Sequence, residues 1–111
     1  FSYIIKSMKP VVFVGSSLND LRDFAPLARQ MAGFQIDRVQ NGLMPEDFKP
    51  MPNVGQGVYE IRVNVQGAWR VLYISRLEDA IYVLHCFQKK TLKTRKEDID
   101  LAQKRYKEIG G

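Results

Sequence analysis

Three apolar, β-branched segments in the second half of the chain, separated by short turns, constrain its fold more than any other feature. They span residues 58–65, 69–75 and 80–88, and Gln66-Gly67 and Glu78-Asp79 occupy the turns between them. Connections this short join antiparallel neighbours, because parallel strands need a crossover of a dozen or more residues. The pattern therefore predicts a three-stranded antiparallel meander.

The first third of the chain predicts one strand followed by a helix. Residues 10–17 are apolar and β-branched and end in Gly15 and two serines, which is typical of a buried strand and a turn. Ser17 and Asp20 fit the N-terminal cap of a helix. One apolar face follows at three- and four-residue spacing, made by Leu18, Leu21, Phe24, Leu27, Ala28 and Met31.

Proline and glycine divide this helical region. Pro26 predicts a kink or a restart near Ala25, and Gly33 predicts a second break before a helical piece at 34–42. Residues 43–57 are rich in Pro and Gly and predict a loop.

The end of the chain predicts a second helical region. Thr94 and Glu97, after the meander, fit a capping box. The apolar stripe of a C-terminal helix follows, at Ile99, Ala102, Tyr106 and Ile109.

The order of these elements predicts an α+β fold. A small curved, antiparallel-type sheet, made of the N-terminal strand and the meander, is expected to pack with its helices against one face, the last helix being C-terminal. A chain of 111 residues has room for one core, so residues 9–111 are expected to form a single domain. Met8-Lys9-Pro10 has the look of a natural start, which sets residues 1–8 apart as a native extension or a cloning remnant.

Composition excludes several classes of function. The one cysteine, Cys86, permits no intramolecular disulfide and favours a reducing, cytoplasmic location. No apolar run reaches the roughly 18 residues of a membrane span. Nucleophile elbows, phosphate loops and metal-ligand spacings are lacking, so we expect no metal and no cofactor.

Positive charge is concentrated at the C-terminal end. Residues 89–111 hold eight Lys or Arg and four acids, and this difference of +4 accounts for most of the net charge of +5. Such a concentration indicates a polyanion or an acidic protein as partner. Lys104, Arg105 and Lys107 are expected only to solvate the last helix, which leaves Lys89 and Lys90 as the functional candidates.

Side-chain alternation predicts that two arginines share one face of the sheet. Arg62 and Arg70 fall on the same face of neighbouring strands if the turn between them is short. Lys90 ends the next strand, at the same parity as Tyr82, Leu84, Cys86 and Gln88. Cations gathered in this way repel one another unless an anion binds between them.

A structural interpretation of the same arginines stays open. Arg62 and Arg70 can be edge charges that pair with acidic neighbours, namely Glu60, Glu78 or Asp79. The cluster Lys89, Lys90, Lys93, Arg95 and Lys96 likewise fits either a solvated helix start or a phosphate site ahead of a helix.

His85 is the only histidine, and its neighbours Leu84 and Cys86 are both apolar. That context favours a satisfied core residue. A catalytic histidine would need a partner base or a phosphate-facing position, and the sequence displays neither.

The motifs GSSLNDLRDF, VYEIRV, WRVLYI, YVLHCFQKKTLKT and EDIDLAQKRYKE, in this order, resemble the RelE/ParE toxin superfamily. Residues 9–109 are covered, and the similarity is greatest to the HigB-like, phage-derived branch. This resemblance implies a RelE-like fold in the toxin of a toxin–antitoxin system. Its expected activity is that of a ribosome-dependent mRNA endonuclease, or mRNA interferase, in which the ribose 2′-OH attacks phosphorus without a metal. Two alternatives remain open: a gyrase-directed inhibitor, and an inactive phage-derived remnant that binds an antitoxin.

The resemblance also implies roles for individual residues. Arg70 and Lys90 would bind phosphate and stabilise the charge of the transition state, and Arg62 would position the backbone or transfer a proton. Lys89, the other member of the basic pair, is a further catalytic candidate. RNA-binding candidates are Lys93, Arg95, Lys96 and Tyr73, although the parity of Tyr73 points to the core.

One departure from the family pattern concerns the general base. Some relatives carry a tyrosine or histidine after the basic pair, and residues 91–98 contain neither. The base is therefore unidentified, with His85 and Lys89 as candidates.

The implied partners are the ribosome, mRNA and a cognate antitoxin, often a helix-turn-helix protein, in a hetero-oligomer. A basic toxin surface is expected to bind an acidic or amphipathic antitoxin segment that covers the cleft.

Overall fold

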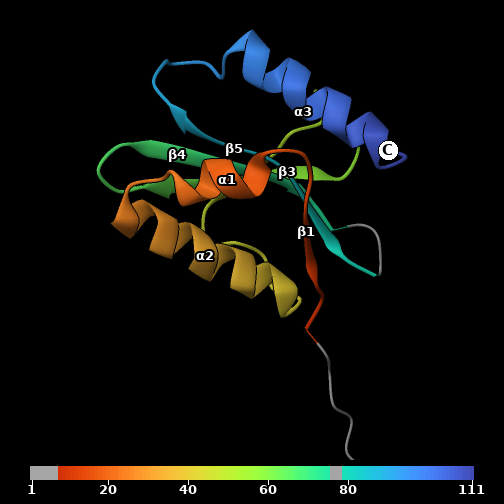
Figure 1. Cartoon of the computed structure of the whole chain (residues 1–111), viewed down its shortest axis with the longest axis horizontal. Coiled ribbons are helices and arrows are strands. Elements are labelled where there is room, and N and C mark those ends of the chain that lie inside the picture. The colour runs from red at the N-terminus through yellow and green to blue at the C-terminus, as the bar shows by residue number, and fades with distance from the viewer. Residues whose placement is uncertain (1–7, 76–78) are drawn as a thin grey trace, which may run out of the picture.

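The structure, a computed structural model, describes residues 8–75 and 79–111. Its elements are β1 (Val11–Phe13), α1 (Ser17–Arg22), α2 (Pro26–Gln40), β2 (Phe48–Pro50), β3 (Val58–Asn64), β4 (Ala68–Ile74), β5 (Ile81–Lys89) and α3 (Lys96–Glu108) (Figure 1). The segment set apart at residues 1–8 lies outside the described residues except for Met8, and so does Glu78 of the second predicted turn.

The five strands form one mixed sheet in the order β1-β5-β4-β3-β2. The meander β3-β4-β5 is antiparallel as predicted, whereas β1 pairs with β5 in parallel, with Val11 opposite Ile81. The loop predicted at 43–57 contains the short strand β2, which pairs antiparallel with β3. The α+β fold is thus confirmed, with an added edge strand.

The helices cover both faces of the sheet rather than one. Residues of α1 and α2, such as Leu21 and Ala28, pack with Val71 and Val83 on one face. On the other face, Ala102 and Tyr106 of α3 pack in a second cluster with Leu72, Ile74 and Leu84. Figure 1 shows the sheet between these two layers. The predicted apolar stripe of α3 is confirmed by this packing.

The N-terminal helices restart at Pro26 as predicted, since α1 ends at Arg22 and α2 begins with this proline. The break predicted at Gly33 is wrong, because α2 runs through it to Gln40. The restart changes the phase of the helix. Ala28 is therefore buried while Leu27 and Met31 are exposed.

Both predicted caps are wrong. Helix α1 follows Ser16 rather than Ser17, whose hydroxyl instead donates to the carbonyl of Val83 at 3.2 Å. Helix α3 begins one residue after Arg95, and no side chain caps it. The main-chain path of the preceding loops, more than side-chain capping, sets where these helices begin.

A β-bulge in β5 decides which side chains reach which face. Leu72 lies opposite His85 and Tyr73 lies opposite Val83, so Leu84 is an extra residue in the pairing. An extra residue inverts the alternation on one side of the bulge. The parity predicted for Lys90 is consequently wrong. Lys89 pairs with Ala68, and Phe87 pairs with Arg70. Because Ala68 and Arg70 are two residues apart on β4, Lys89 lies on the same face of the sheet as Arg70.

Candidate functional site

A cleft of about 580 Å³ opens on the α3 face of the sheet, toward the end of β5. It is formed by β2 and the turn after it, by β3, by the end of β5 and by the loop that leads into α3. Its lining residues are Lys49, Pro50, Met51, Pro52, Asn53, Glu60, Arg62, Lys89, Leu92, Lys93, Thr94 and Ile99. We call it the basic cleft.

Four cations and one carboxylate line the basic cleft. The cations are Lys49, Arg62, Lys89 and Lys93, and the carboxylate belongs to Glu60. Register brings them together: Lys49 lies opposite Glu60, and Glu60 and Arg62 occupy alternate positions of β3 on the α3 face. A concave surface lined by one sign of charge concentrates ligands of the opposite sign. The basic cleft is therefore suited to an anion such as a phosphodiester.

Arg70 lies opposite Arg62 in the pairing of β3 and β4, as the alternation predicted. Its side chain is buried, with Nε 3.6 Å from Oε1 of Glu60. One Nη donates to the carbonyl of Trp69 at 3.0 Å and to Oδ1 of Asn64 at 3.4 Å. Burial lowers the pKa of Arg70 from its ordinary value, and the charge of Glu60 opposes this shift.

The pairing of Arg70 with Glu60 agrees with the structural interpretation, but the edge position is wrong, because Arg70 is buried on the central strand β4. Arg70 is not among the residues that line the basic cleft, whereas Glu60 is. Glu60 therefore connects Arg70 to the basic cleft, because one of its oxygens lies 3.6 Å from Arg70 Nε and its side chain borders the cleft.

The remaining predicted site residues fall into different places. Lys90 is exposed beyond the end of β5 and does not line the basic cleft. Arg95 and Lys96 are also exposed, and each reaches an acid of α3: Arg95 Nε lies 3.8 Å from Asp98, and Lys96 Nζ lies 3.1 Å from Asp100.

Tyr73 is wrong as a base-stacking candidate. Only 1% of its surface is exposed, and its ring packs in the core on the face opposite the basic cleft. Burial raises the pKa of its hydroxyl well above the ordinary value. Its ring is therefore inaccessible to a nucleobase.

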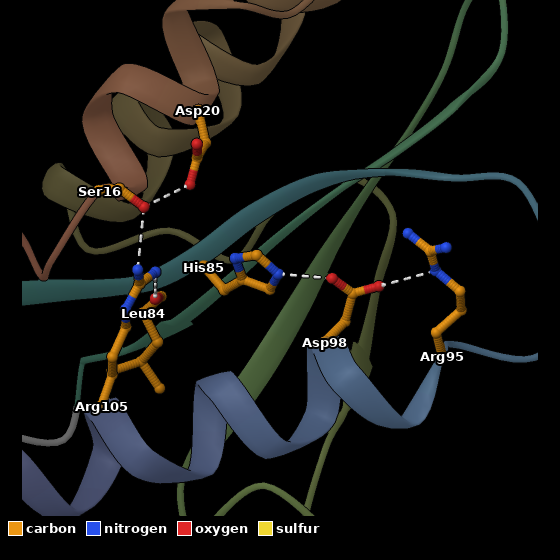
Figure 2. Close-up of polar contacts among 7 residues, drawn as sticks. All are labelled: Ser16, Asp20, Leu84, His85, Arg95, Asp98 and Arg105. Carbon is orange, nitrogen blue, oxygen red and sulfur yellow. Dashed lines mark hydrogen bonds and ion pairs between the residues drawn. The ribbon is translucent and has the colours of Figure 1, made fainter.

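His85 is buried and does not line the basic cleft. Its Nε2 lies 2.7 Å from Oδ1 of Asp98 in α3, and its ring stacks on Phe87 with 4.8 Å between centroids. Figure 2 shows the imidazole on the α3 side of β5, with its second nitrogen turned away from the carboxylate of Asp98. That nitrogen, Nδ1, has no hydrogen-bond partner. His85 is therefore a core residue, as predicted, but only one of its two ring nitrogens has a hydrogen-bond partner.

Arg105 corrects the expectation that it merely solvates the last helix. It is 7% exposed, and its guanidinium donates to the carbonyl of Leu84 and to Oγ of Ser16, both at 2.9 Å. Ser16 in turn donates to Asp20 at 2.8 Å (Figure 2). This chain of contacts fastens α3 to β5 and to the start of α1.

Sequence reasoning missed three contributors to these sites. Lys49 lay in the predicted loop, and Glu60 was weighed only as a partner for an arginine. Asp98 was not singled out, and it lies 13 residues along the chain from the histidine that it contacts. The contacts of Lys49, Glu60 and Asp98 depend on the register between strands and on the docking of α3 against β5. No local sequence pattern predicts either of these.

Two structural absences apply to residues 8–75 and 79–111. No cluster of three His, Cys, Asp or Glu side chains there has an arrangement that can hold a metal ion. No helix in the same residues has the length and apolar character needed to cross a bilayer.

A comparison with curated proteins found no match. A comparison with family models matched residues 19–107 to the family described as Phage derived protein Gp49-like (DUF891). The match runs from Asn19 in α1 to Lys107 in α3 and includes every residue that lines the basic cleft. The chain therefore belongs to the Gp49-like family of phage-derived proteins, a family of RelE-like and toxin-like proteins.

Proposed function

We propose that this protein is the toxin of a toxin–antitoxin system and that it cleaves mRNA on the ribosome. The observation that carries the proposal is the basic cleft, in which four cations surround one buried carboxylate. Membership in the Gp49-like family is compatible with a toxin role. A ribosome-bound messenger supplies the anion that such a cleft suits.

The cations of the cleft act on the scissile phosphate. Lys89 and Arg62 donate to its non-bridging oxygens, and Lys93 holds a neighbouring phosphate at the mouth of the cleft. In-line attack on phosphorus concentrates negative charge on these oxygens, and fixed donors stabilise that charge more in the transition state than in the ground state.

Glu60 is the general base in this proposal. Its carboxylate removes the proton from the ribose 2′-OH, and the 2′ oxygen forms a bond to phosphorus as the bond to the 5′ oxygen breaks. The leaving 5′ oxygen takes a proton from the ammonium of Lys89, which gives a 2′,3′-cyclic phosphate and a 5′-hydroxyl. Arg70 is a positioning residue, because it orients Glu60 from a buried site 3.6 Å away.

The test is primer extension on cellular mRNA after brief induction of the wild type and of Glu60→Gln. Wild-type induction should produce new 5′ ends within messages. Loss of a general base costs about 10²- to 10⁴-fold in rate, so Glu60→Gln should leave the messages intact. Glu46→Gln is the matched control, because Glu46 is an exposed carboxylate outside the basic cleft. Circular dichroism checks that each variant folds.

The competing functions give different results in the same cells. A gyrase-directed inhibitor would induce DNA-damage signalling while messages stay intact. An inactive remnant would leave growth, messages and DNA unaffected by soluble protein. Undiminished cleavage by folded Glu60→Gln would contradict the role of the carboxylate while leaving RNA cleavage itself intact.

A further inference from the structure

A second concavity lies apart from the basic cleft, beside α1. Its volume is about 360 Å³, and α1, the start of β4 and the end of β5 enclose it. The lining residues are Asp20, Asp23, Phe24, Trp69, His85, Cys86, Phe87 and Gln88. We call it the acidic pocket.

The charge of the acidic pocket is opposite to that of the whole chain. Its lining holds Asp20 and Asp23 and no Lys or Arg, on a protein with a net charge of +5. The negative field of Asp20 reaches the floor of the pocket. There, burial first and the charge of Asp20 second raise the pKa of Cys86 to about 12.

His85, one of the lining residues, carries a buried nitrogen without a hydrogen-bond partner. Its Nε2 lies 2.7 Å from Asp98, and a carboxylate only accepts, so Nε2 carries the ring proton. Its other nitrogen, Nδ1, has no hydrogen-bond partner although His85 is only 6% exposed. A buried polar atom without a partner is costly, and Nδ1 of a neutral ring that carries its proton on Nε2 would accept an N–H from a ligand.

The pocket also has an aromatic wall. The rings of Phe24 and Trp69 lie 4.8 Å apart between centroids, tilted by 42°. Aromatic faces attract cations, and a flat guanidinium both stacks on them and presents five N–H donors in a fixed plane. An ammonium offers three donors at one point, so separate acceptors on several sides favour the guanidinium.

We propose that the acidic pocket binds the arginine side chain of a protein partner. The pocket adjoins an open strand edge, since β1 pairs with β5 only at Ile81–Val83 and no described strand covers that side of β5 from His85 onward. A partner segment that lies along this edge delivers a side chain to the pocket beside it. The proposal is independent of RNA cleavage, because it shares no residue with the basic cleft.

The probe for this site is Nα-acetyl-L-arginine amide, and the reporter is the fluorescence of Trp69, the only tryptophan of the chain. At constant ionic strength, the signal should change and saturate with a dissociation constant on the order of millimolar, as one cation contact with a half-buried and an exposed carboxylate allows. The neutral isostere Nα-acetyl-L-citrulline amide should produce no saturable change. A response equal for both probes, or no saturable response to the arginine probe, would overturn the proposal.

Two variants locate the binding. Asp23→Asn, at an exposed position in the acidic pocket, should weaken binding about three- to fivefold, the size of an exposed ion-pair contribution. Asp37→Asn removes the same charge from an exposed position of α2 outside the pocket and should leave binding unchanged. Equal binding by Asp23→Asn and the wild type would refute this location.

A peptide separates a protein partner from a free small molecule. A short extended peptide with one arginine between β-branched residues should bind about tenfold more tightly than the amino-acid probe, because strand-edge hydrogen bonds add to the side-chain contact. The same peptide with citrulline should lose this gain. A peptide that binds no more tightly than Nα-acetyl-L-arginine amide would contradict the assignment to a protein partner.

Discussion

Glu60, Arg70 and Arg105 are charged side chains that are more than nine-tenths buried, and each fixes the position of another group. Arg70 holds Glu60 at the wall of the basic cleft. Arg105 crosses from α3 to a strand carbonyl and to a serine at the start of α1. Buried charges persist where hydrogen bonds satisfy them, and removal of one partner leaves the others without compensation. These residues therefore connect the stability of the fold to the geometry of the site.

Arg105→Met should lower the free energy of unfolding by about 2–3 kcal/mol, since the change leaves a buried carbonyl and a hydroxyl without their donor. Urea denaturation measures the difference. Lys104→Met removes the same charge at the neighbouring, exposed position and should stay within about 0.5 kcal/mol of the wild type. Equal stability of the two variants would show that the Arg105 contacts contribute nothing net.

At the scale of elements, the sequence predicted well where local pattern decides. The meander, the restart at Pro26 and the alternation that brings Arg62 opposite Arg70 all follow from periodicity and turn residues. The predicted alternation of side chains in β5 is wrong beyond Leu84, because a bulge inserts one extra residue there. Periodicity alone cannot locate a bulge. The alternation therefore placed Lys90, instead of Lys89, on the face of the two arginines.

Strand β2 and the partner of His85 were missed for related reasons. Residues Phe48–Pro50 are exposed, and the strand ends in a proline. In the sequence this pattern is typical of a loop, and only the pairing with β3 identifies the segment as a strand. Asp98 meets His85 only because α3 docks across β5. Contacts of this kind depend on tertiary packing, so the basic cleft was only partly predictable.

Two glycines give opposite tests of element packing. Gly33 lies in α2 with open space where a Cβ would be, so Gly33→Ala should stabilise the protein by about 0.5–1 kcal/mol through helix propensity. A Cβ on Gly55 would lie 2.5 Å from the ring of Tyr106, so Gly55→Ala must displace the α3 contact and should destabilise by about 1–3 kcal/mol. Thermal unfolding should show a higher melting temperature than the wild type for Gly33→Ala and a lower one for Gly55→Ala. A destabilising Gly33→Ala would argue against a continuous α2.

At the scale of the whole molecule, the two concavities have opposite charge. The basic cleft lies on the α3 face of the sheet, and the acidic pocket lies beside α1. One chain thereby presents separate surfaces to a polyanion and to a cationic side chain. If both proposals hold, RNA and a protein partner would bind without competing for the same side chains.

Binding of a single-stranded RNA oligonucleotide should weaken steeply with salt. Two phosphates, one bound by Arg62 and Lys89 and a neighbouring one bound by Lys93, predict a slope of log K against log salt of roughly −1.4, because each neutralised phosphate releases counterions. Lys93→Ala should reduce the magnitude of this slope by about 0.7. The matched control is Lys107→Ala, which removes an exposed lysine of α3 outside the cleft and should leave the slope unchanged. Affinity that stays flat from low to high salt would contradict a polyanion ligand.

The central claim is that the bulge of β5 places Lys89, and not Lys90, in an RNA-cleaving cleft. Messenger cleavage by Lys89→Ala and Lys90→Ala, quantified by primer extension at equal levels of folded protein, tests it most directly, because the variants remove the same charge from adjacent positions. The account predicts that Lys89→Ala loses cleavage by at least about 100-fold, as expected for a group that stabilises transition-state charge, while Lys90→Ala keeps it. Loss of cleavage in Lys90→Ala alone, or equal activity of both variants, would contradict it.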